Sequence, residues 1–174
     1  MDKVIYFNNS ENVSSMVYYD FIDYAFSKTD YFMLVYINYY GKGYTSKQKF
    51  FRMSLEKFKV KSRSNPSWPG TLHCIAPNTT YKVVFYKTDQ EAKKFLKMVD
   101  RISEWSGGMP EDLAFFKRNQ CWFYSVGHEK IAAIIHATVE DIAFVDSLKI
   151  ASKNEALDHK DNYFDAYDEQ LTER

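Results

Sequence analysis

The chain has 174 residues, 23 basic and 23 acidic side chains, and a formal net charge of zero. A chain of this length corresponds to one domain, which buries roughly 70% of the surface that its unfolded form exposes. Aromatic residues make up 18% of the sequence, whereas Gly (6) and Pro (4) are scarce, and this composition excludes a disordered chain. We therefore expect a compact fold with a real core.

The first part of the chain alternates between strand and helix patterns. Residues 3–7 predict a short strand, and Ser10 or Ser14 can cap a helix that ends near Ser27. The continuous apolar run Tyr31–Ile37 is typical of a strand covered on both faces and predicts the central strand of a sheet.

The next segment is expected to stay in the sheet. Gly41–Gly43 predicts a hairpin turn, and Phe50–Val60 predicts a strand with one apolar and one basic face. Asn65–Gly70, with two prolines and a glycine, predicts a loop. A hairpin is then expected between residues 71–76 and 81–86.

A long helix is the strongest prediction of the second half. Thr88–Glu91 has capping-box spacing, an apolar stripe follows at helical spacing, and Gly107-Gly108 supplies the end. The stripe consists of Phe95, Leu96, Val99 and Ile102. Three more elements are expected: a hairpin of 113–117 with 121–126, a strand at 131–135, and a last helix capped by Thr138.

Together these patterns predict a single α+β domain over residues 1–151. Its sheet would be mixed or mostly antiparallel and packed by about three helices. Residues 152–174 are expected to form an acidic tail or a partly ordered C-terminal helix.

The charge is distributed unevenly along the chain. Residues 42–63 hold eight bases against one acid, Glu56, whereas residues 155–174 hold seven acids and two bases. Aromatic residues are interleaved with the bases, so we expect a binding face for another protein with an acidic surface. The candidate binding residues are Tyr39, Tyr40, Lys42, Tyr44, Lys57, Lys59, Lys61, Arg63 and Trp68. Nucleic acid is the alternative ligand of this basic face, although no nucleic-acid-binding motif accompanies it.

No motif for catalysis, metal or cofactor binding stands out. His128-Glu129 is the best catalytic pair, but neighbours in a strand point to opposite faces, so the two are not expected to interact. If the protein were a small hydrolase or transferase centred on His128, the third group would be Asp112, with Cys121 or His136 as alternatives. The four histidines (73, 128, 136 and 159) lack metal-binding spacing, so no metal and no cofactor is expected.

Cysteine usage and hydropathy indicate a soluble cytoplasmic protein that does not enter a membrane. Cys74 and Cys121 have no Cys-x-x-Cys spacing and are expected to be reduced core thiols. The N-terminus lacks the apolar core of a signal peptide, and no apolar run approaches the roughly 20 residues of a spanning helix.

One short sequence occurs twice. Glu111–Phe115 reads Glu-Asp-Leu-Ala-Phe, and Glu140–Phe144 reads Glu-Asp-Ile-Ala-Phe. We interpret the pair as two element starts, where acidic residues are favourable, and not as a repeat array.

The resulting hypothesis is a non-catalytic intracellular protein that binds another protein. Small chains without motifs, rich in Tyr and oppositely charged at two segments, fit toxin-neutralising immunity proteins and phage or bacterial defence modulators.

Overall fold

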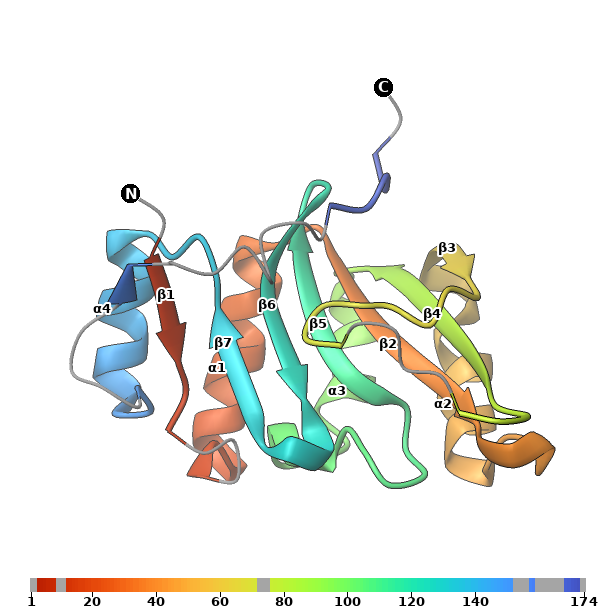
Figure 1. Ribbon diagram of the computed structural model, residues 1–174. Coiled ribbons are helices and arrows are strands. Elements are labelled where there is room, and N and C mark those ends of the chain that lie inside the picture. The colour runs from red at the N-terminus through yellow and green to blue at the C-terminus, as the bar shows by residue number, and fades with distance from the viewer. Residues whose placement is uncertain (1–2, 9–11, 72–75, 152–156, 159–167, 173–174) are drawn as a thin grey trace.

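The computed structural model describes residues 3–8, 12–71, 76–151, 157–158 and 168–172. These residues form one α+β domain built on an eight-stranded sheet with the order β3-β4-β2-β5-β6-β7-β1-β8 (Figure 1). Every neighbouring pair is antiparallel, as predicted for most of the sheet. The strands are β1 (Lys3–Tyr6), β2 (Tyr31–Asn38), β3 (Lys59–Arg63), β4 (Thr80–Lys87), β5 (Glu111–Lys117), β6 (Gln120–Val126), β7 (Ile131–Ile134) and β8 (Leu157–Asp158).

Four α-helices of the described chain pack on one face of this sheet, behind it in Figure 1. They are α1 (Ser15–Lys28), α2 (Ser46–Leu55), α3 (Gln90–Leu96) and α4 (Val139–Leu148). Each helix contributes at least one side chain, such as Phe21, Phe51, Leu96 or Val145, to a single apolar cluster with the sheet. Burial of these side chains is the main force that holds the helices in place.

The strand β2 is an interior strand between β4 and β5 and is buried on both faces, as its continuous apolar run predicts. Phe32, Leu34 and Tyr36 point toward the helices, and Met33 and Val35 belong to a second cluster on the opposite face. Successive side chains of a strand alternate between faces, so such a strand needs two apolar layers.

The face opposite the helices is partly covered by residues 64–71, which follow β3 and cross in front of the strands in Figure 1. Trp68 of this loop is only 1% exposed and packs with Tyr81 and Tyr124 in the second cluster. Leu171 packs against the same cluster. The expectation that Trp68 lies on a binding face is therefore wrong, because its ring belongs to the core.

The expected strand at Phe50–Val60 is wrong for most of its length. Residues 46–55 form the helix α2, and only the segment from Lys59 onward is a strand, β3. Gln48, Phe51 and Leu55 are the buried residues of α2, and this spacing matches one face of a helix. The turn at Gly41–Gly43 consequently leads into a helix and is not a hairpin.

The helix expected after Thr88 exists but is much shorter than predicted. Asp89, not Thr88, is its N-cap and accepts a hydrogen bond from the Glu91 amide, and the helix ends at Leu96. Val99 and Ile102 are nevertheless buried in the helix-side core. The apolar stripe therefore predicted the buried residues correctly but the backbone incorrectly. Its second half lies in turns and in a 3₁₀ segment (Ile102–Glu104) instead of a continued α-helix.

Other predictions are confirmed in the described residues. Four predicted elements form: the first helix (α1), the hairpin of β5 and β6, the strand β7 and the helix capped by Thr138 (α4). Of the C-terminal segment, the structure describes β8 and an extended stretch at 168–172, while the rest of the expected helix and Cys74 lie outside the described residues. Among the described helices, none combines the length and apolar character needed to span a membrane.

Candidate functional site

Helix α2 is anchored to the end of β2 by polar contacts. The Thr45 side chain accepts from the Gln48 amide, and the Gln48 side chain in turn accepts from the Thr45 amide, which completes a capping box. Gln48 Nε2 also donates to the Ile37 carbonyl at 3.0 Å. With Phe51 and Leu55 buried against the sheet, the opposite side of α2 faces outward.

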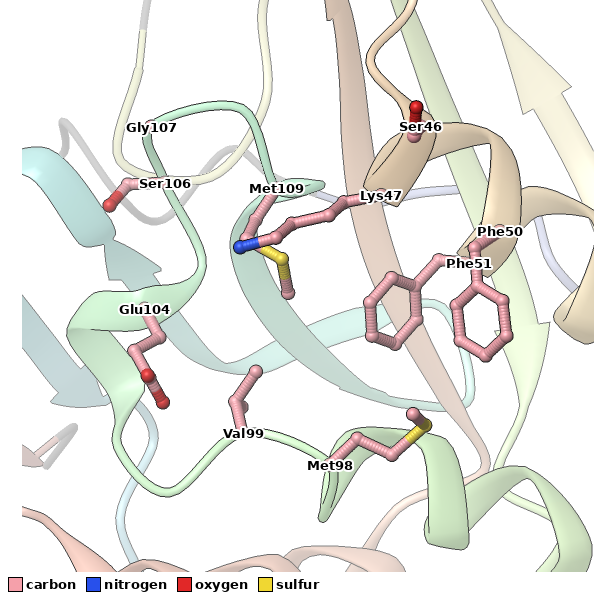
Figure 2. A pocket seen from close by; sticks show the side chains of 10 residues that line it. All are labelled: Ser46, Lys47, Phe50, Phe51, Met98, Val99, Glu104, Ser106, Gly107 and Met109. Carbon is pink, nitrogen blue, oxygen red and sulfur yellow. The ribbon is translucent and has the colours of Figure 1, made fainter.

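A groove with a volume of about 590 Å³ lies beside this outward face (Figure 2). Its sides are α2 and the segment that follows α3, and apolar side chains dominate its lining. The lining residues are Ser46, Lys47, Phe50, Phe51, Met98, Val99, Glu104, Ser106, Gly107 and Met109. Ligand and peptide sites of proteins are concave, mostly apolar and supplied with a few polar groups, and this groove matches that description.

Three large apolar side chains at this groove and on α2 are exposed to solvent. Phe50 is 44% exposed, Met98 is 59% exposed and Met53 is 80% exposed. Phe50 stacks edge-on against Phe51, with ring centroids 5.3 Å apart. Methionine adapts its shape to different partners, so exposed Met beside an aromatic ring is typical of binding surfaces.

Much of the basic segment 42–63 is neutralised within the molecule. Lys57 pairs with Glu91, and Lys59 pairs with Glu56. The Arg52 guanidinium lies 4.9 Å from the centre of the Tyr44 ring. Of the candidate binding cations, therefore, Lys57 and Lys59 already have acidic partners.

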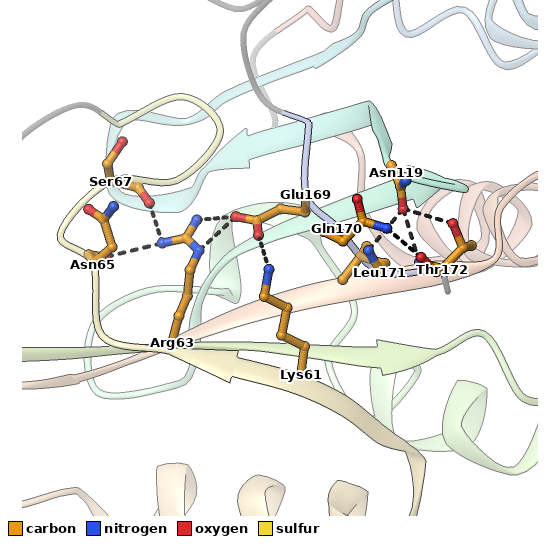
Figure 3. Close-up of polar contacts among 9 residues, drawn as sticks. All are labelled: Lys61, Arg63, Asn65, Ser67, Asn119, Glu169, Gln170, Leu171 and Thr172. Atoms are coloured by element: carbon orange, nitrogen blue, oxygen red, sulfur yellow. Dashed lines mark hydrogen bonds and ion pairs between the residues drawn. The ribbon is translucent and has the colours of Figure 1, made fainter. Parts of the chain in front are cut away.

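The acidic C-terminal segment neutralises two more cations (Figure 3). Glu169 accepts from Arg63 Nε at 2.6 Å and from Lys61 Nζ at 2.9 Å. The Asn119 side chain accepts from the Leu171 amide, which fixes this segment on the turn between β5 and β6. Glu169 thus sets one acid of the C-terminal segment against two bases of segment 42–63.

Three cations at one end of the segment remain without an acidic partner in the part of the chain that the structure describes. They are Lys42, Lys47 and Lys49, and all three are exposed. Lys47 and Lys49 belong to α2, next to Phe50 and Met53. We define these four residues together with Met98 and Lys42 as the α2 surface.

The predicted tyrosines lie close to the α2 surface in the sequence and differ in exposure. Tyr40 is exposed and adopts a left-handed backbone conformation with φ of 53°. Tyr39 is partly exposed, and its hydroxyl donates to Glu111 Oε1 at 2.9 Å. Tyr44 is half-buried against Arg52.

The catalytic candidates come together at the start of β5. Asp112 and His128 belong to a group with Glu111, in which one ligand atom of each residue lies within 4.8 Å of the others. His128 Nε2 also lies 3.6 Å from Glu129 Oε1. The prediction that this pair does not interact is wrong, because residues 127–129 form a 3₁₀ turn, η5, instead of a strand.

Burial perturbs both carboxyl groups of this cluster. It raises the pKa of Glu111 to about 7, and the neighbouring Asp112 contributes in the same direction. Burial also raises the pKa of Asp112, although hydrogen bonds from Trp68 Nε1 (2.8 Å) and the Gly127 amide (3.0 Å) favour its charged form. Burial likewise raises the pKa of the Cys121 thiol, which accords with an inert core cysteine.

Sequence reasoning missed both the groove and Glu111. The Thr45-x-x-Gln48 capping box was a readable signal for α2, and with it the outward position of Phe50 and Met53. No local signal marks Glu111 as buried. Comparisons with models of protein families, with curated proteins and with solved structures give no match for this chain.

Proposed function

We propose that this protein works by binding another protein through the α2 surface, without catalysing a reaction. The partner is a protein that presents an apolar anchor flanked by acidic residues. The observation that carries the proposal is the combination of an apolar groove, exposed Phe50, Met53 and Met98, and three cations without acidic partners in the described chain.

The physical case rests on the cost of leaving this surface in water. Apolar side chains that lie together on a surface gain free energy when a partner covers them, and aromatic anchors commonly dominate such interfaces. Charges at the rim add little affinity but accelerate association with an oppositely charged partner. Lys47 and Lys49 are placed for that role, because they are exposed and lie on α2 with Phe50 and Met53, and Lys42 is exposed in the segment before α2.

The distribution of charge supports a protein partner over nucleic acid. Binding to a polyphosphate backbone needs many cations that are free to displace counterions. Lys57, Lys59, Lys61 and Arg63 already form ion pairs with acidic residues of this chain. Neutralisation of a toxin, as by an immunity protein, or modulation of a phage or bacterial defence system in the cytoplasm is the biological setting that we propose for such stoichiometric binding.

The test is affinity capture of partners by the tagged full-length chain from its native host, followed by mass spectrometry. Three samples are compared: the unmodified protein, Phe50→Ser with Met53→Ser, and Lys47→Glu with Lys49→Glu. We expect a specific partner that the apolar variant loses. The charge-reversed variant should associate more slowly and lose most of its dependence on salt concentration.

Matched control variants distinguish specific binding at the α2 surface from nonspecific binding by exposed apolar or charged side chains. Met16→Ser with Val139→Ser removes two exposed apolar side chains from α1 and α4. Lys87→Glu with Lys117→Glu reverses two exposed charges at the opposite end of β2. The controls should capture the same partner as the unmodified protein. A partner that all variants retain equally would refute the α2 surface, and stronger salt-dependent capture of nucleic acid than of protein would favour the alternative.

A further inference from the structure

A second site lies outside the groove, where Glu111 and Asp112 meet His128. We propose that these three side chains bind a divalent metal ion. The carboxylates come from the start of β5 and the imidazole from η5, and their ligand atoms lie within 4.8 Å of one another. None of the three residues lines the groove, so the site is separate from the proposed binding surface.

The burial of the two carboxylates is the observation that calls for a cation. Glu111 is 4% exposed and Asp112 is 2% exposed, and the two are adjacent in the chain. Within the described residues, neither forms an ion pair with a lysine or an arginine. Buried charges in proteins are paired or coordinate metals, because an isolated charge loses its hydration without compensation.

The carboxylates are held in position by donors that leave lone pairs free. The Tyr39 hydroxyl donates to one oxygen of Glu111. Trp68 Nε1 and the Gly127 amide each donate to a different oxygen of Asp112. Such outer contacts orient the ligands of metal sites, and each carboxylate oxygen can accept a second interaction.

The third ligand, His128, is exposed, and its present neighbour is the exposed Glu129 carboxylate at 3.6 Å. The ligand atoms already lie within 4.8 Å of one another, and rotation of the exposed imidazole ring can bring them to the closer spacing of a coordination sphere. One imidazole nitrogen and two carboxylate oxygens suit Zn²⁺ or Mn²⁺ better than Ca²⁺ or Mg²⁺, which prefer oxygen ligands alone. Three protein ligands leave at least one coordination position for water.

Titration calorimetry on the full chain, stripped with a chelator, tests the proposal with Zn²⁺, Mn²⁺ and Mg²⁺ as probes. We expect one equivalent of Zn²⁺ or Mn²⁺ to bind and to raise the melting temperature, since a ligand that binds only the folded state stabilises it. Mg²⁺ should bind at least tenfold more weakly. A Co²⁺-loaded sample should show a visible absorption spectrum that changes when the imidazole ligand is removed.

The variants His128→Asn and Glu111→Gln locate the ion. Each should weaken Zn²⁺ binding at least tenfold, and His128→Asn changes an exposed side chain, so its fold should survive. Glu140→Gln, at the equivalent position of the duplicated pentapeptide, is the control and should bind as the unmodified protein does. No binding at millimolar metal, or equal binding by all variants, would overturn the proposal. Partner capture in the presence of a chelator tests the α2 surface independently of this site.

Discussion

The two copies of one pentapeptide adopt different structures. Glu111–Phe115 opens the strand β5, whereas Glu140–Phe144 lies in the first turns of the helix α4. Four of the five residues are identical, and the fifth exchanges Leu for Ile. The pair teaches that secondary structure here follows from the surroundings of the pentapeptide and not from its own residues.

The difference begins with what precedes each copy. Thr138 forms a capping box with Asp141, so the second copy has a helix start built into its sequence. Pro110 precedes the first copy, and Asp112 adopts a left-handed conformation with φ of 56°. The strand is then completed by pairing with β2 and β6, which no local signal can supply.

The two aspartates are both 2% exposed and both accept from a tryptophan, yet their charges are satisfied differently. Asp141 accepts from the Tyr24 hydroxyl, Trp122 Nε1 and both the amide and the hydroxyl of Thr138. Asp112 accepts from Trp68 Nε1 and from the Gly127 amide, and it lies beside a second buried carboxylate, Glu111. Among the described residues, the Asp141 carboxylate thus has four hydrogen-bond donors, whereas the Asp112 carboxylate has two and lies beside another carboxylate without a lysine or arginine ion pair to offset the repulsion.

The largest expected effect comes from Gly127→Ala, which tests how tightly the Asp112 environment is built. A Cβ at this position would lie 2.3 Å from the Trp105 carbonyl oxygen, so the backbone must move and the hydrogen bond to Asp112 must weaken. We expect a loss of about 3 kcal/mol in the free energy of unfolding, measured by urea denaturation. Gly107→Ala, where the added atom meets nothing within 4 Å, should cost about 1 kcal/mol from its positive φ alone. Equal costs for both would show that the close approach to Trp105 does not constrain η5.

The second prediction concerns pH and Glu111 in the presence of a chelator. Burial raises the pKa of Glu111 to about 7 in the folded state, against an ordinary value of 4.5. Between these values the folded state holds more protons than the unfolded state, so the free energy of unfolding falls as pH rises through this window. The loss should reach at most about 3 kcal/mol.

Denaturation of Glu111→Gln measures that contribution directly. The variant should match the unmodified protein near pH 4 and exceed it in stability at pH 8. The control is Glu140→Gln, which changes a surface carboxylate, and it should follow the unmodified protein across the whole range. If the free energy of unfolding of Glu111→Gln and of the unmodified protein changed with pH in parallel, Glu111 would be no more perturbed than Glu140 of the second copy.

The third prediction compares the aspartates themselves. Asp141→Asn removes a charge that four donors and a helix N-terminus favour, so it should cost about 2 kcal/mol. Asp112→Asn also weakens hydrogen bonds, but it removes repulsion from Glu111, so its cost should stay near or below about 1 kcal/mol. Thermal melts at pH 7 in a chelator measure both, and a larger loss for Asp112→Asn would contradict the proposed shortage of positive charge.

The smallest effect is expected at the outer glutamate of the second copy. Glu140 is 68% exposed and pairs with Lys28 at 2.6 Å. Such surface pairs contribute between zero and about 1 kcal/mol, and salt screens them. Glu140→Gln should therefore shift the melting temperature only slightly at low salt and not at all at high salt. A large shift would mean that this surface pair, and not the capping box, holds the start of α4.

The parts of the fold that could be predicted are those whose signal is local. The continuous apolar run of β2, the capping box before α4 and the hairpin turn between β5 and β6 each lie within a few residues. The incorrect prediction of a strand at residues 50–60 falls where the sequence fits both a strand pattern and a helix pattern. Phe50 and Phe51 read as strand residues, although the capping box of Thr45 and Gln48 and the burial of Phe51 and Leu55 mark a helix.

The candidate sites were less predictable than the fold. The sequence identified the basic segment and singled out Asp112 and His128, but it could not show that Glu169 would neutralise Lys61 and Arg63. It also gave no sign that Glu111 would be buried beside them.

By itself, the sequence determined an α+β domain with a central apolar strand, because periodicity and capping act between near neighbours in the chain. Only the tertiary structure decided which charges are paired, which apolar residues of α2 stay exposed and which carboxylates are buried together. The physical reason is that charge pairing and burial depend on segments far apart in sequence, such as residues 61 and 169 or 111 and 128. A pentapeptide that occurs twice could therefore form a strand with a charged, buried end in one place and a fully capped helix in the other.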